Sequence, residues 1–273
     1  MTDVFDDLSA DALSRVSAEH YFNSFMCFSV VPAVEVHEGE DMIRLASPGI
    51  PNELTNTVLR CHLSPDRADA VIHMTHEYFY DRDVIPSWQI CPGGLPADLE
   101  ERLIKSGLTL SAEQPSMCID LDKLNEEIIT PAGFRMQRVT SAETMIEKHI
   151  WLSRLSEERS LGTLIMEMFS AYGFDEESNW QHYIGVLNER PVSCVSVFYS
   201  AGVAGIYVLV TLPEARRQGI GSAMTLRALL DARERGYRVG VLQSTEMGYN
   251  VYRKLGFETC FKIKTYAPPE SEK

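Results

Sequence analysis

Hydrophobic and polar positions follow two periods along this chain, and each period predicts a different kind of element. Short apolar and β-branched runs bounded by turn residues predict strands, and apolar residues spaced by three and four predict helices. The predicted strands are 42–47, 57–63, 87–91, 117–121, 133–139, 182–187, 191–200, 203–210, 237–243 and 257–266. The predicted helices are 1–20, 64–80, 96–107, 141–155, 161–172, 219–235 and 247–255. This alternation predicts an α/β (α+β) fold, a mixed central sheet flanked by helices.

Turn residues divide the pattern. Asn188-Glu189-Arg190 lies between two strand-like runs and predicts a hairpin turn. The stretch 122–133 is polar and then carries Pro131 and Gly133, so we place a domain boundary near residue 130. The predicted domains are 1–129 and 130–273, while the aromatic stretch 21–36 remains unassigned.

Composition narrows the classes of function. The 273 residues carry 25 Lys and Arg against 39 Asp and Glu, a formal charge of −14. Such a chain lacks the basic face of a nucleic-acid coat, and it has no apolar run long enough to span a bilayer. Its first residues show no secretory pattern, so a cytoplasmic protein is expected. The six cysteines form no C-x-x-C pair and predict reduced thiols. The seven histidines show no zinc spacing, so we predict no metal.

The stretch with the clearest chemistry follows the apolar run 203–210. There Arg216-Arg217-Gln218-Gly219-Ile220-Gly221 opens a predicted helix, whose first N–H groups and dipole attract anions. Glycines let a phosphate approach the backbone closely. Residues 214–238 contain six arginines and three acids, a local +3 in an acidic chain. Gly-x-Gly alone is equally typical of a tight turn, and it matches neither the Rossmann fingerprint nor the P-loop.

A second motif makes the first more specific. Arg216-x-x-Gly219-x-Gly221 after a strand resembles the acyl-CoA pyrophosphate loop of the GNAT acyltransferase superfamily. Tyr252-Arg253-Lys254-Leu255-Gly256-Phe257, about thirty residues later, resembles that family's Tyr-x-x-x-Gly-Phe signature. The resemblance covers residues 133–266. It implies a GNAT fold with acetyl-CoA as co-substrate. It places the acyl-CoA against the following residues: Leu209, Val210, Thr211, Arg216, Arg217, Gln218, Gly219, Ile220, Gly221, Ser222, Gly248 and Tyr252.

The resemblance also implies an acid but leaves the base open. Tyr252 would give its phenolic proton to the departing thiolate; otherwise it is a core aromatic. No carboxylate lies on the strand 203–210, and Glu246 is the nearest acid after the next strand. Glu246 is a candidate base, or only an acid at a helix N-terminus. Tyr207 would line the acceptor pocket, and Gly248 would bring the helix close to the cofactor or serve packing alone.

The first half has a similar rhythm of elements and resembles the degenerate N-terminal half of tandem GNAT proteins. In place of a pyrophosphate loop it carries Leu63-Ser64-Pro65-Asp66-Arg67-Ala68-Asp69, which has no glycine and two acids. We therefore predict no acyl-CoA site there.

The resemblance predicts an N-acetyltransferase that moves an acetyl group from acetyl-CoA to a primary amine of a small molecule. A non-catalytic acyl-CoA sensor or scaffold, or a transferase with another acyl donor, remains open. Residues 140–180 hold eight acids and three bases, which would attract a cationic amine or form a solvated helix face. We expect a monomer or homodimer, with no nucleic-acid or membrane partner.

Overall fold

The computed structural model describes residues 4–147 and 159–269. The chain forms two compact units: unit 1 is Met1–His20 with Pro115–Cys260, and unit 2 is Tyr21–Gln114 with Phe261–Lys273. The boundary predicted near residue 130 does not coincide with this division. Pairing between strands far apart in sequence is the reason, because it is tertiary hydrogen bonding that assigns residues 115–120 to unit 1.

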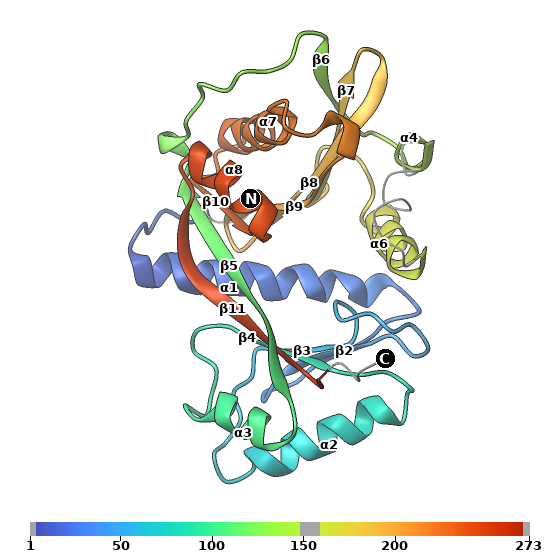
Figure 1. Ribbon diagram of the computed structural model, residues 1–273, viewed down its shortest axis with the longest axis vertical. Helices are drawn as coiled ribbons and strands as arrows, with labels where there is room; N and C mark the ends of the chain where they lie inside the picture. Colours follow the sequence, from blue (N-terminus) through green and yellow to red (C-terminus); the bar gives the residue numbers. More distant parts are fainter. Residues whose placement is uncertain (1–3, 148–158, 270–273) are drawn as a thin grey trace. The chain divides into compact units, whose positions relative to one another are not determined.

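Unit 1 is built on a mixed sheet with strand order β11-β5-β10-β9-β8-β7-β6 (Figure 1). Its strands are β5 (Thr109–Asp120), β6 (Phe134–Arg138), β7 (Trp180–Leu187), β8 (Arg190–Ser200), β9 (Val203–Thr211), β10 (Val239–Gln243) and β11 (Glu258–Ala267). Its helices are α1 (Ala10–Met26), α4 (Ala142–Glu147), α6 (Arg159–Tyr172), α7 (Ile220–Glu234) and α8 (Glu246–Leu255), with 3-10 turns at Leu121–Lys123 and Pro213–Ala215. For the first two residues of α6 and the last two of α4, only the backbone is described. Helix α1 and strands β5 and β11 continue into unit 2.

The two faces of this sheet are covered by different helices. One face carries Ile206 and Leu242, which belong to a large core with residues of α7 and α8 such as Leu229 and Leu255. On the other face Val241 packs with Val16 of α1, and Phe169 of α6 packs on Trp180. Burial of these apolar side chains is the main stabilising contribution to the unit.

Unit 2 repeats the same build on a smaller scale. The sheet of this unit has the strand order β1-β2-β3-β4, followed by the parts of β11 and β5 that belong to the unit. The four strands are β1 (Glu35–Glu38), β2 (Ile43–Ala46), β3 (Thr57–Leu59) and β4 (Ser87–Ile90). Helices α2 (Ala68–Tyr80) and α3 (Leu99–Lys105), with a 3-10 turn at Cys27–Val30, complete it. Strands β3 and β4 are parallel, and Trp88, Phe79 and Leu103 are fully buried in its core.

The structure tests the predicted elements. The hairpin at residues 188–190 is confirmed, since Asn188 and Glu189 have positive φ and Leu187 pairs with Arg190. The first helix spans 10–26, so residues 4–9 of the helix predicted over 1–20 are not helical, and residues 1–3 lie outside the described residues. The strand predicted over 117–121 is the end of the twelve-residue β5. The unassigned stretch 21–36 holds the end of α1, a 3-10 turn and the start of β1. The helix predicted over 141–155 is described only to Glu147, and its remainder lies outside the described residues.

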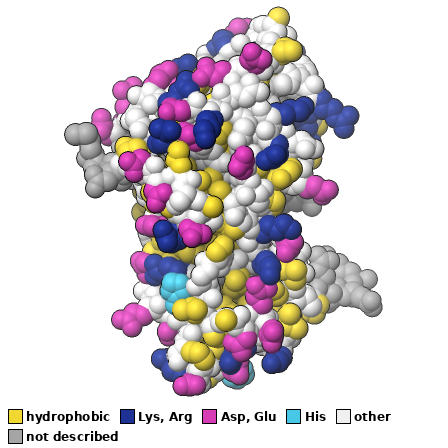
Figure 2. Space-filling view, turned by 90° about the vertical axis from the view of Figure 1, so that its left-hand side faces the viewer, with side chains coloured by type: hydrophobic (Ala, Val, Ile, Leu, Met, Phe, Trp, Pro, Cys, Tyr) yellow, Lys and Arg dark blue, Asp and Glu magenta, His cyan; other side chains and the backbone are white. Residues whose placement is uncertain are grey.

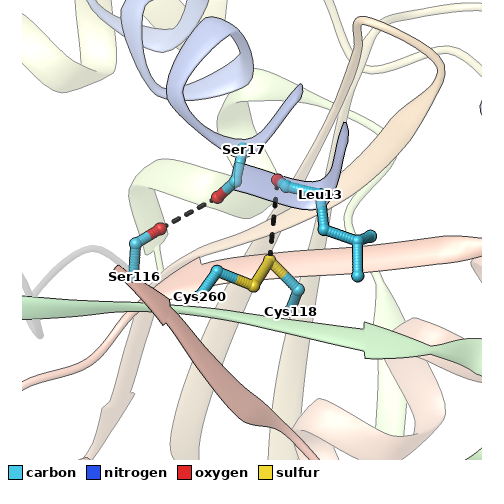
Figure 3. The surroundings of a disulfide bond; sticks show 5 residues. All are labelled: Leu13, Ser17, Ser116, Cys118 and Cys260. Carbon is cyan, nitrogen blue, oxygen red and sulfur yellow. Dashed lines mark hydrogen bonds between the residues drawn. A yellow bond between two sulfur atoms is a disulfide. The ribbon is translucent and has the colours of Figure 1, made fainter. Parts of the chain in front are cut away.

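The prediction that every cysteine is a reduced thiol is wrong for one pair. Cys118 of β5 and Cys260 of β11 form a disulfide between neighbouring strands, with Cα atoms 6.2 Å apart (Figure 3). They are 142 residues apart in sequence, so spacing gave no sign of their contact. Cys61, Cys91 and Cys194 remain thiols, and burial raises the pKa of each above its usual range. Within the described part of the chain, no helix is long and apolar enough to cross a membrane.

Candidate functional site

Strands β9 and β10 separate at the centre of the unit 1 sheet. They pair in parallel from Ala204 to Ile206 on β9, and β9 then continues alone on that side to Thr211. At the point of separation Val208 has φ +49° and the pairing of β9 with β8 shifts register. A bulge of this kind bends and twists its strand. The result is an open strand edge at residues 207–211, whose side chains are all half-buried.

The backbone of β9 alternates its hydrogen bonds between β8 and this open edge. The carbonyl of Val210 accepts a bond from Ser193 Oγ at 2.7 Å, and Leu212 N–H donates to the carbonyl of Val192 at 3.0 Å. The backbone N–H and C=O groups of the alternate residues, Leu209 and Thr211, therefore point away from β8 toward the open edge. This is the orientation that the resemblance implies for a strand-like bond to a pantetheine arm. The backbone of Val210, placed in the same set by the sequence, instead faces β8.

The loop after β9 leads directly into the start of α7. Arg217 has φ +61° and Gly219 has φ +81°, so the chain turns twice through the left-handed region before Ile220. No side chain of the described residues caps this helix, so its first N–H groups point into the loop without a protein partner from a side chain. A Cβ on Gly219 would lie 2.5 Å from the carbonyl oxygen of Ile129, whereas one on Gly221 would meet only Thr211 Oγ1 at 3.9 Å. The two glycines of the motif thus have different reasons to be there.

The local arginine excess concentrates at this loop. Arg227, Arg233 and Arg238 each pair with a carboxylate. Arg216 and Arg217 are exposed, and neither forms an ion pair with any described residue. Arg235, at the C-terminal end of α7, also forms no ion pair with a described residue and donates to the carbonyl of Glu176. Two unpaired arginines thus precede the N-terminus of α7 and one lies at its other end. Elsewhere the charges are mixed: on the face in Figure 2, Lys and Arg side chains alternate with Asp and Glu.

The rest of the predicted loop residues take three different positions. Gln218 is exposed and its Nε2 donates to the carbonyl of Glu214 at 3.3 Å. Ile220 is buried in the core beneath α7, so only its N–H is available to a ligand. Ser222 is half-buried in the first turn of α7.

Tyr252 lies on α8, on the sheet face that α7 and α8 cover. Its ring is buried against Phe257, and burial raises the pKa of its phenol to about 12. The phenol is therefore protonated at neutral pH, as a proton donor must be. A Cβ on Gly248 would lie 2.9 Å from the Tyr252 ring. This favours the second of the two interpretations of Gly248, in which the glycine serves packing by making room for Tyr252. Thr245 caps the helix, because its side chain accepts a bond from the N–H of Gly248 at 3.2 Å.

Glu246, the candidate base, is exposed in the first turn of α8. Before it, Ser244 is buried and donates to the carbonyl of Thr245 at 2.8 Å. Glu246 therefore has the place of a helix N-terminal acid, and no contact sets it apart as a base. The acidic count over 140–180 includes Glu157 and Glu158, which lie outside the described residues.

On the opposite sheet face the structure brings together residues that the sequence did not connect. Tyr207 Oη lies 3.1 Å from Nδ1 of His20, 187 positions earlier, on α1. His20 Nε2 lies 3.0 Å from the carbonyl oxygen of Phe198. A carbonyl only accepts, so Nε2 carries the proton and Nδ1 accepts from the Tyr207 hydroxyl. Burial lowers the pKa of His20 to about 4, which keeps the ring neutral.

Unit 2 contains the counterpart of the open edge, but there the edge is closed. Strands β3 and β4 pair only at two positions, and Arg60 after β3 has φ +47°, as Val208 has after its separation. Here Leu95 N–H donates to the Cys61 carbonyl at 2.9 Å, and Leu63 N–H donates to the Leu95 carbonyl at 3.0 Å. The chain's own loop thus takes the backbone positions that are open in unit 1. Among the described residues, no three His, Cys, Asp or Glu side chains gather in a way that could hold a metal ion.

Comparison with known proteins agrees with this geometry. Residues 178–259 match the family model of the acetyltransferase (GNAT) domain. The fold is similar to that of a GCN5-related N-acetyltransferase from Kribbella flavida, with TM-score 0.71, 18% identity, and 92% of this chain and 96% of that chain covered.

Two further solved structures share the fold. A tandem GNAT protein from the clavulanic acid biosynthesis pathway has TM-score 0.63 and 17% identity, and the match covers 98% of this chain and 97% of that chain. A GCN5-related N-acetyltransferase from Sphaerobacter thermophilus has TM-score 0.65 and 14% identity, with 84% and 80% covered. No curated protein matches the sequence. At these identities the structural likeness shows the fold, and the family match concerns residues 178–259.

Proposed function

We propose that the C-terminal half of this chain, residues 130–273, moves an acetyl group from acetyl-CoA to the primary amine of a small molecule. Residues 178–259 match the acetyltransferase (GNAT) domain, and the fold is similar to that of a tandem GNAT protein. The observation that carries the proposal is the open edge of β9 leading into the uncapped N-terminus of α7. An extended polar arm ending in a pyrophosphate suits this pair of features: the arm bonds to the strand edge and the anion to the helix N-terminus. The backbone groups at the edge of β9 and the N–H groups at the N-terminus of α7 are of the kinds that such a ligand needs.

Each part of the site has a proposed task. Leu209 and Thr211 offer backbone groups to the arm, and the N–H groups of residues 217–222 with the Arg217 side chain bind the phosphates. Acetyl-CoA, when bound, supplies an acyl carbon activated as a thioester. Tyr252 donates its phenolic proton to the sulfur as the C–S bond breaks and the amine nitrogen forms its bond to the acyl carbon. Glu246 stays the candidate for the proton that the amine loses.

A CoA-release assay with acetyl-CoA and a panel of primary amines tests the transfer. We expect turnover with at least one amine. Tight CoA binding without turnover on any amine would favour the second candidate, a sensor or scaffold that binds acyl-CoA. Turnover only with longer acyl-CoA donors would replace the acetyl assignment.

The binding half of the proposal has its own test. Arg217→Glu reverses a charge that no described carboxylate neutralises, so it should weaken CoA binding about tenfold or more. Arg227→Glu is the matched control, because Arg227 already pairs with Asp231 at 2.7 Å further along α7. Equal CoA affinity for Arg217→Glu and the unmodified protein would refute the loop assignment.

A further inference from the structure

A row of polar side chains crosses the unit 1 sheet at the level where β9 and β10 separate. Gln243 is paired in register with Ser116 of β5, and Tyr207 is paired with Ser196 of β8. Gln243 and Tyr207 each directly follow the last mutually paired residues of their strands. These two side chains therefore flank the opening, on the face away from α7 and α8.

Three members of the row have partners on this face. Ser116 Oγ lies 2.8 Å from Ser17 Oγ of α1 (Figure 3). Ser196 Oγ lies 2.8 Å from His182 Nδ1. Tyr207 donates to His20, as described above. Ser116, Ser196 and His20 are fully or almost fully buried, so the row is a fixed neutral surface.

Gln243 is the exception in this row. Its Nε2 atom is buried and has no hydrogen-bond partner among the described residues. Buried polar groups in folded proteins are normally satisfied, so an unpaired amide donor beside an open strand edge points to a group that arrives with a ligand. An amide nitrogen only donates, and its partner must therefore be an acceptor such as an oxygen atom.

We propose that Gln243 determines acceptor specificity: its Nε2 donates to a carbonyl or carboxylate oxygen that the acceptor carries next to its amino group. This rests on the proposed acetyltransferase function and names its substrate class as amines with a neighbouring oxygen, such as amino acids and their amides. Tyr252 lies on the other face of the sheet, so Gln243 contacts the acceptor and takes no part in proton transfer to sulfur.

Rigid neighbours make this discrimination effective. The Tyr207 ring is held by its bond to His20 and by an edge contact with Trp180, whose ring centroid lies 5.5 Å away. An acceptor that lacks the oxygen leaves the Gln243 donor unpaired in a wall that cannot relax to satisfy it. Sites built to hydrogen-bond a substrate group reject analogues without that group strongly.

The test compares matched amines on the full chain. Each pair has one member with the neighbouring oxygen and one isostere without it, for example glycinamide and isobutylamine. Each is assayed by CoA release with the unmodified protein, Gln243→Met and Gln243→Glu. We expect the unmodified protein to prefer the oxygen-bearing member, and both variants to lower its kcat/KM about tenfold or more, mainly through KM. The isostere should change by less than about threefold.

Two controls separate specificity from structure. Ser116→Ala changes the neighbouring member of the row and should leave the preference between the paired amines unaltered. CoA affinity should be the same in all variants, which reports that the domain is folded. Equal losses for both members of a pair in Gln243→Met, or full activity of Gln243→Glu, would overturn the inference while leaving the acetyltransferase function intact. Absence of turnover by the unmodified protein on every amine would overturn the proposed function, and this inference with it.

Discussion

The two glycines of the phosphate-loop motif should respond in opposite directions to the same substitution. Gly219 has φ +81°, and a methyl group there would lie 2.5 Å from the Ile129 carbonyl oxygen. The left-handed conformation alone costs about 1–2 kcal/mol for alanine, and the contact with backbone adds to that. Gly221 lies inside α7 with open space around its Cα. Alanine there should stabilise the helix by up to about 1 kcal/mol.

We therefore expect Gly219→Ala and Gly221→Ala to differ by about 2–3 kcal/mol in the free energy of unfolding. At about 2–4 °C per kcal/mol, their melting temperatures should differ by about 4 °C or more. Circular dichroism during thermal unfolding measures this, and calorimetry with CoA measures the ligand effect. Gly221→Ala should bind CoA within about threefold of the unmodified protein, since it keeps the N–H that faces the ligand. Destabilisation by Gly221→Ala, or no destabilisation by Gly219→Ala, would refute this account of the loop.

Three further predictions concern the acid, the first half and the response to low pH. Tyr252→Phe should slow kcat about tenfold or more with near-normal CoA affinity; Tyr249→Phe is the control, and equal kcat in both would remove Tyr252 from catalysis. Calorimetry should find one CoA site per chain, because the loop at Leu95 already occupies the strand edge in unit 2; two sites would contradict that argument. Burial lowers the pKa of His20 to about 4 and of His182 to about 3, so the unfolded chain binds their protons first as pH falls. Stability from these groups is present above pH 6.5 and declines toward pH 4 by about 1.4 kcal/mol per pH unit for each histidine. His20→Gln should reduce that decline in urea unfolding, and an unchanged slope would contradict it.

Much of the local structure was readable from the sequence, because it depends on neighbours along the chain. The period of apolar residues located α7, and the two residues at Asn188 and Glu189 located the β7–β8 turn. Errors arose where tertiary pairing extended an element: β5 continues back to Thr109 because that part lies beside β11.

The phosphate loop and the role of Tyr252 could be predicted because each belongs to a short motif whose residues lie within a few positions of one another. His20, Gln243 and the closed edge at Leu95 had no such signal. His20 lies 187 positions from Tyr207, and a histidine in an ordinary helix does not indicate which strand it will cover. The unpaired donor of Gln243 exists only when the surrounding atoms are in place.

The sequence by itself thus determined the class of fold and predicted an anion-binding loop, since these depend on period, turn chemistry and charge over short distances. The role predicted for Tyr252 came from the resemblance of its motif to the GNAT signature. Tertiary structure alone decided which of two similar units has an open strand edge, and which face of the sheet carries the polar row. Both depend on hydrogen bonds between strands and helices far apart along the chain, whose register is set when the sheet and its covering helices assemble.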